Sequence, residues 1–126
     1  MHGEINKIYL LAVLRSSDLT VVASYQQDRD VTVEGVRECI AGNANMEIGK
    51  RYTSQGDAQS INYIIDPQGR VYAIVTNPSF SLRSAFKAID DLADLFNRDL
   101  GSRIASATEQ SLSQAASPIM KQIFQK

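Results

Sequence analysis

The sequence predicts an α+β domain in which a mostly antiparallel sheet carries helices on both faces. Two pairs of strand-like segments with short turns between them indicate antiparallel hairpins at the two ends of the strand set. Two further segments have apolar residues at helical spacing, and each must bury its apolar stripe against a sheet face. The predicted order is two strands, a helix, three strands and two helices.

The length and composition fit one globular domain. The chain has 126 residues, so we predict a single domain over residues 1–126. Its hydrophobic fraction of 44% and charged fraction of 21% are typical of folded domains and argue against disorder. The 13 Lys and Arg residues against 14 Asp and Glu residues give a net charge of -1, so the charge balance does not predict nucleic acid as a partner.

The first hairpin is predicted from two apolar segments. Residues 5–15 and residues 19–25 are rich in large and β-branched side chains, which favour strands. Residues 16–18 between them, Ser-Ser-Asp, have the composition of a turn. A buried antiparallel hairpin therefore opens the chain.

A first helix is predicted after this hairpin, with Asp30 or Thr32 as its cap. Gly35 weakens it by about 1 kcal/mol relative to Ala, and the Gly-Asn pair at residues 42–43 ends it. Its apolar stripe consists of Val33, Val36, Cys39 and Ile40.

Three strands are predicted next. Residues 49–55 form a polar, weak strand that belongs at a sheet edge, whereas residues 59–66 form a stronger one. The Asp-Pro-Gln-Gly sequence at residues 66–69 has the composition of a type I turn. Residues 70–76 complete the second hairpin, and the Asn-Pro-Ser sequence at residues 77–79 ends the strand.

The clearest helix is predicted over residues 81–100, with Gly101 as its C-cap. A final helix is predicted within residues 107–125, where Pro118 should interrupt or kink it because proline lacks a backbone donor. The stripe of the clearest helix consists of Leu82, Ala85, Phe86, Ile89, Leu92, Ala93 and Phe96.

Residues of the kind that carry catalysis are scarce. His2 is the single histidine, and Cys39 is the single cysteine. This pair does not predict a zinc site or an activated nucleophile, and no glycine-rich loop opens a helix. We therefore expect no catalytic site, no cofactor and no metal, and we interpret Cys39 as a buried structural thiol. The carboxylates of Asp90, Asp91 and Asp94 fit a solvated helix face.

A family resemblance rests on three segments. Residues 80–86 (FSLRSAF), followed by the apolar stripe of the same helix, resemble the start of the second helix of longin domains. The hairpin at residues 61–75 and the opening segments at residues 8–15 and 19–24 resemble longin hairpins. The chain resembles most the N-terminal longin domains of vesicle (R-type, synaptobrevin-like) SNAREs, especially those acting between endoplasmic reticulum and Golgi.

The resemblance implies a longin or profilin-like fold, with a five-stranded antiparallel sheet between one helix and two helices. It also implies a regulatory protein-binding domain in vesicle transport and membrane fusion, which binds its own SNARE segment or a coat or tethering protein. The implied protein-binding surface consists of Val33, Val36, Ile40, Met46, Ile48 and Tyr52. The alternative for Val33, Val36 and Ile40 is that they pack on the sheet.

Membrane attachment would need a segment outside these residues. No apolar run reaches the roughly 20 residues that span a bilayer. A SNARE would continue into a heptad helix and an anchor, and the domain would lie in the cytoplasm at the face of endoplasmic reticulum, Golgi or endosomal membranes. One alternative is a free-standing longin-like subunit of an adaptor or tethering complex. Another is an enzyme or small-molecule sensor on a related fold, which a co-purifying ligand would indicate.

Overall fold

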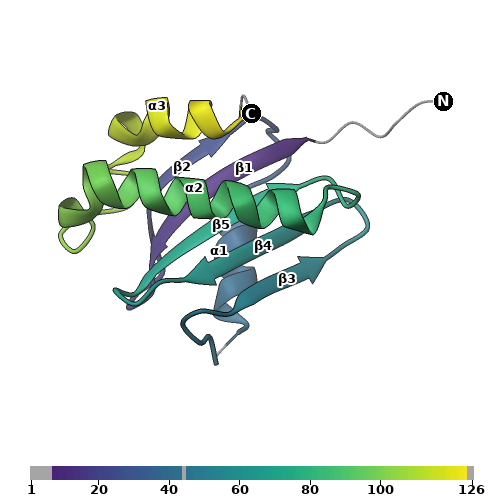
Figure 1. Cartoon of the computed structure of the whole chain (residues 1–126), viewed down its shortest axis with the longest axis horizontal. Helices are drawn as coiled ribbons and strands as arrows, with labels where there is room; N and C mark the ends of the chain where they lie inside the picture. Colours follow the sequence, from purple (N-terminus) through teal and green to yellow (C-terminus); the bar gives the residue numbers. More distant parts are fainter. Residues whose placement is uncertain (1–6, 44, 125–126) are drawn as a thin grey trace.

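One five-stranded antiparallel sheet organises the domain. The computed structural model describes residues 7–43 and 45–124. The sheet order is β2-β1-β5-β4-β3, and every neighbouring pair is antiparallel (Figure 1). The strands are β1 (Ile8–Arg15), β2 (Thr20–Gln26), β3 (Arg51–Gln55), β4 (Ser60–Ile65) and β5 (Arg70–Thr76).

Three α-helices cover the two faces of this sheet. Helix α1 lies on one face, and helices α2 and α3 lie side by side on the other (Figure 1). This arrangement confirms the predicted fold class and element order, and it is consistent with a longin-like fold. The helices are α1 (Val33–Ala41), α2 (Leu82–Leu100) and α3 (Ser113–Phe124), and a short 3-10 helix η1 (Gly101–Arg103) follows α2.

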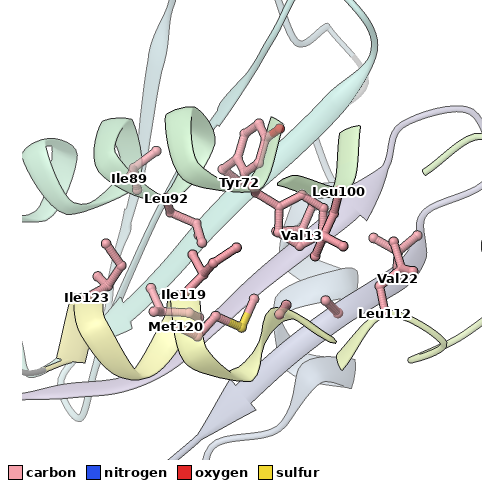
Figure 2. Packing of buried hydrophobic residues seen from close by; sticks show 14 of the residues in the cluster. Val13, Val22, Tyr72, Ile89, Leu92, Leu100, Leu112, Ile119, Met120 and Ile123 are labelled. Carbon is pink, nitrogen blue, oxygen red and sulfur yellow. The ribbon is translucent and has the colours of Figure 1, made fainter. Parts of the chain in front are cut away.

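The alternation of side chains along the central strands builds two cores. In β1, Leu10 and Leu14 pack on the α1 side, whereas Leu11 and Val13 pack on the side of α2 and α3. All four side chains are fully buried, which explains why β1 is continuously apolar in the sequence. Figure 2 shows the second core, where Tyr72 and residues of both helices meet.

The helix starts use the caps that the sequence offers. Of the two predicted caps for α1, Thr32 is the one used, and its Oγ1 accepts a hydrogen bond from the Gly35 amide at 3.2 Å. At α2, the Oγ of Ser81 accepts from the Ser84 amide at 3.3 Å. Each cap satisfies one of the amides that a helix N-terminus leaves without a helical partner.

Gly101 ends α2 as predicted, but for a different physical reason. Its backbone is right-handed (φ −56°, ψ −38°) and continues into η1, so it is not a left-handed cap. Its carbonyl accepts a hydrogen bond from Arg70 Nη2 at 3.0 Å, and a Cβ added there would lie 3.3 Å from Arg70 Nη1. Glycine therefore permits the close approach of the Arg70 guanidinium.

Pro118 does not interrupt the last helix. Helix α3 runs through Pro118 to Phe124, which is within the predicted range. The last residue of that range, residue 125, lies outside the described residues. Pro118 removes the hydrogen bond to the carbonyl of Gln114, but both residues are exposed, so water can solvate that carbonyl. The apolar stripe of α3 is buried on the other side and keeps the helix in place.

The start of the predicted first strand and His2 fall in residues 1–6, which lie outside the described residues. Strand β1 begins at Ile8, and the second hairpin closes at the predicted turn, where the Gly69 amide donates to the Asp66 carbonyl at 3.1 Å.

The connection between η1 and α3 covers the β2 edge of the sheet. The amide of Gln110 donates to the Val21 carbonyl at 2.7 Å, and the amide of Leu112 donates to the Val22 carbonyl at 2.9 Å. A register shift between β1 and β2 leaves Val22 as an extra residue in β2, opposite no residue of β1. The β2 edge is therefore occupied, whereas among described residues β3 pairs only with β4.

Candidate protein-binding surface

Two stacked tyrosines fasten the loop between α1 and β3. Tyr52 and Tyr63 lie opposite each other in the β3–β4 pair, with ring centroids 5.3 Å apart and an angle of 21° between the rings. The Tyr52 hydroxyl accepts from the Glu47 amide at 2.6 Å, and Asn43 Nδ2 donates to the Tyr63 hydroxyl at 3.0 Å. Burial raises the pKa of Tyr63 above its ordinary value of 10.0. The two hydroxyls thus hold the loop on the α1 side of the sheet.

Part of the predicted binding surface lies in the core. Val36 and Ile40 are each 1% exposed and pack against the sheet in the α1-side core, and Val33 is half-buried against the same core. The alternative for these three residues, that they pack on the sheet, therefore describes the observed conformation. The physical reason is that, of the described helices, α1 alone lies on this face, so its apolar stripe is needed to cover the sheet there.

The other predicted residues remain accessible. Ile48 is 58% exposed, whereas Met46 and Tyr52 are half-buried at the border of the α1-side core. They lie in the loop and in β3, whose outer edge pairs with no described residue. We define the loop–β3 surface as Met46, Ile48 and Arg51–Gln55. Its apolar side chains lie beside unpaired backbone donors and acceptors, which is the chemistry that a protein segment can bind.

On the sheet face opposite to α1, strand β3 contacts helix α2. The Arg51 guanidinium lies over the ring of Phe86, 5.1 Å from its centroid, and 3.8 Å from a carboxylate oxygen of Asp90. Both charged side chains are more than half exposed, so this ion pair contributes at most about 1 kcal/mol. Thr53 Oγ1 donates to the buried Asn62 Oδ1 at 2.7 Å. These contacts position the edge strand without covering its outer edge.

Asp90 and Asp91 of α2 make separate ion pairs. Asp90 faces Arg51, whereas Asp91 lies 3.1 Å from the ammonium of Lys87. They do not form the paired carboxylates that acid–base chemistry uses. Within residues 7–43 and 45–124, no three His, Cys, Asp or Glu side chains gather where they could hold a metal ion. No helix in those same ranges is long and apolar enough to cross a membrane.

Two residues of this region differ from their interpretation in the sequence. Tyr63 was expected only in a strand, and its role in holding the loop follows from lying opposite Tyr52, which requires the strand register. Cys39, interpreted from the sequence as a buried structural thiol, is only half-buried and packs against the α1-side core.

No protein-family model matches the chain, and no curated protein matches it. The functional argument therefore depends on the fold and on the loop–β3 surface.

Proposed function

We propose that the chain is the regulatory longin domain of a vesicle SNARE, acting in vesicle transport and membrane fusion. Its ligand is a SNARE segment, its own or a partner's, or a vesicle coat or tethering protein. Its place is the cytosolic face of endoplasmic reticulum, Golgi or endosomal membranes. The element order and the one-helix and two-helix faces support this proposal.

The observation that carries the proposal is the difference between the two sheet edges. The β2 edge is occupied by residues of the same chain, with Gln110 and Leu112 hydrogen-bonded to it. The β3 edge is unpaired among described residues and lies beside Ile48, whose side chain is 58% exposed. An apolar residue next to an open strand edge favours a protein ligand over a small molecule, because extended or helical segments use such edges.

Photocrosslinking tests the proposal in the intact protein. A photoreactive amino acid replaces Ile48 in the full-length protein, expressed in its native cells and irradiated there. We expect crosslinks to a SNARE segment or to a coat or tethering protein. The control places the same amino acid at Arg103, which is exposed in η1 away from the loop–β3 surface. Equal crosslinking at both positions would contradict the proposal.

A matched pair of substitutions separates binding from folding. Ile48→Asp and Leu82→Asp each replace a largely exposed apolar residue, 58% and 51% exposed, on opposite faces of the sheet. Neither should change the free energy of unfolding by more than about 0.5 kcal/mol, because both side chains are exposed. We expect Ile48→Asp to abolish the crosslinked partner's co-precipitation and Leu82→Asp to preserve it. Stable co-purification with constant subunits, without any SNARE segment, would instead identify a subunit of an adaptor or tethering complex.

A further inference from the structure

A cleft lies on the sheet face opposite to α1, between the first half of α2 and the end of α3. Its volume is about 520 Å³. The apolar part of its wall consists of Ile8 from β1, Phe80 before α2, Ala88 from α2 and Ile123 from α3. Ile8 and Phe80 are only half-buried, so the cleft presents apolar surface that residues 7–43 and 45–124 leave uncovered. Clefts of roughly 300–1,000 Å³ with apolar walls are typical of small-molecule sites.

The rim of this cleft is cationic. Arg83 is exposed at the rim and makes no hydrogen bond or ion pair with any residue that the structure describes. The ammonium of Lys87, also at the rim, is 75% exposed and lies 3.1 Å from Asp91. The charge of Lys87 is thus matched within the cleft, whereas the charge of Arg83 is left for a ligand.

A second cleft of about 540 Å³ shares one lining residue, Ile8, with the first. Two more cations, Lys7 and Arg29, line it together with the carboxylate of Asp28. Asp28 Oδ1 already accepts from the Asp30 amide at 2.9 Å. The linings of the two clefts together therefore hold four cations against two carboxylates.

We propose that the first cleft binds a single-chain anionic amphiphile, with the hydrocarbon chain on the apolar wall and a carboxylate or phosphate headgroup on Arg83. Guanidinium groups bind both headgroups through paired, charge-assisted hydrogen bonds. The hydrocarbon chain removes the exposed apolar surface of Ile8 and Phe80 from water. This inference does not depend on the proposed function, because it uses the face of the sheet opposite to the loop–β3 surface.

Binding is tested with dodecyl phosphate and dodecanoate, each titrated below its micelle-forming concentration into the isotope-labelled protein. The readout is the NMR shift of the Ile8 and Ala88 methyl groups. Dodecyl maltoside supplies the chain without the charge, and inorganic phosphate supplies the charge without the chain. We expect at least one anionic amphiphile to bind at least about tenfold more tightly than either control compound. The headgroup that binds more tightly distinguishes a phospholipid from a fatty acid as the source.

Two substitutions locate the site. Arg83→Gln should weaken binding of the anionic amphiphile about tenfold, and Ala88→Phe should abolish it by filling the cleft. Lys121→Gln is the matched control, because Lys121 is an exposed cation of α3 that does not line the cleft. Circular dichroism confirms folding of each variant. Binding that is absent, equal for dodecyl maltoside, or unchanged in Arg83→Gln would overturn the proposal.

Discussion

Tyr72 combines deep burial with a polar group that the core must satisfy. Its side chain is fully buried between β5 and α2, and its ring meets Phe96 edge-on with centroids 6.4 Å apart. The hydroxyl donates to Asn97 Oδ1 at 2.8 Å, and Asn97 also accepts from Arg70. Burial raises the pKa of Tyr72 above its ordinary value of 10.0, because the phenolate would lose its hydration. The neutral phenol is therefore part of the folded state.

Alkaline pH should destabilise the domain through Tyr72. Since the pKa is higher in the folded than in the unfolded state, this stabilisation is complete below pH 10 and is lost as the pH rises through the folded-state value. In Tyr72→Phe we expect the free energy of unfolding to fall less steeply above pH 10. At neutral pH the variant should lose about 1 kcal/mol, from the missing hydrogen bond. Urea denaturation across this pH range measures both effects.

The control for this prediction is Tyr25→Phe, which removes a half-buried phenol whose ring packs on Phe124. If Tyr72→Phe also declines with the unaltered slope, another group causes the alkaline destabilisation.

The candidate surface shows what residue patterns can and cannot predict. Spacing placed Val36 and Ile40 on one helix face, and the structure keeps them together, but it turns that face to the sheet. Periodicity identifies residues that share a face, whereas the direction of the face depends on which sheet surface lacks another cover. Tyr52 was predicted near a sheet edge because its segment is short and polar, and β3 is indeed the edge strand. The role of Tyr63 required the strand register, which no local pattern contains.

Among whole elements, those with strong local signals were predicted best. Strand β5 (Arg70–Thr76) has the predicted ends, because a turn with proline and glycine precedes it and an Asn-Pro pair follows it. Helix α2 begins one residue after its predicted start, where Ser81 caps it. The cover of the β2 edge was not predicted. Its contacts join residues that are distant in the sequence, such as Val21 with Glu109, 88 positions apart, and Ser24 with Ser113, 89 positions apart.

The connection between η1 and α3 that covers the β2 edge contains one strained backbone position. Gln110 has a φ of 60°, in the left-handed region that costs a non-glycine residue about 1 kcal/mol. Its amide donates to the Val21 carbonyl, and its side-chain carbonyl accepts from the Ser24 hydroxyl at 3.0 Å. The Ser24 amide in turn donates to Ser113 Oγ at 3.1 Å. The hydrogen bonds to β2 offset the strain, so the cover should depend on them.

Ser113→Ala should loosen the β2 edge. The substitution leaves the half-buried Ser24 amide without its acceptor, so we expect a loss of about 1 kcal/mol in the free energy of unfolding. Hydrogen exchange of the Ser24 amide should become faster, as NMR can measure residue by residue. Ser111→Ala is the matched control, because within the described part of the chain the Ser111 hydroxyl bonds the nearby Thr108 amide and no atom of β2. Equal exchange of the Ser24 amide in both variants would show that Ser113 does not protect the edge.

On the scale of the whole molecule, one sheet joins two separate cores. Strands β1 and β5 are central, and their side chains alternate between the α1 side and the side of α2 and α3. The composition, the predicted hairpins and the apolar stripes of the helices were enough to indicate this layered α+β fold. They were not enough to order the strands, because the pairing of β1 with β5 joins segments that are distant in the sequence. That pairing is what makes the two cores parts of one structure.

Shortening one side chain in each core should therefore destabilise the same cooperative unfolding transition. Ile40→Val removes a methylene from the α1-side core, and Ile123→Val removes one from the core of α2 and α3; both side chains are 1% exposed. Each should lower the free energy of unfolding by about 1 kcal/mol. Because the residues share no cluster, the double variant should lose about 2 kcal/mol, the sum to within about 0.5 kcal/mol.

Methyl NMR during urea denaturation follows both faces at once, because the two single variants identify the methyl signals of Ile40 and Ile123. Both signals should disappear at the same urea concentration, since strands β1 and β5 belong to both cores and a domain of this size unfolds cooperatively. An earlier loss of the Ile40 signal would mean that α1 detaches before the sheet unfolds. Detachment of α1 would expose the α1-side core beside the loop–β3 surface. Val36 and Ile40 would then become accessible to a partner.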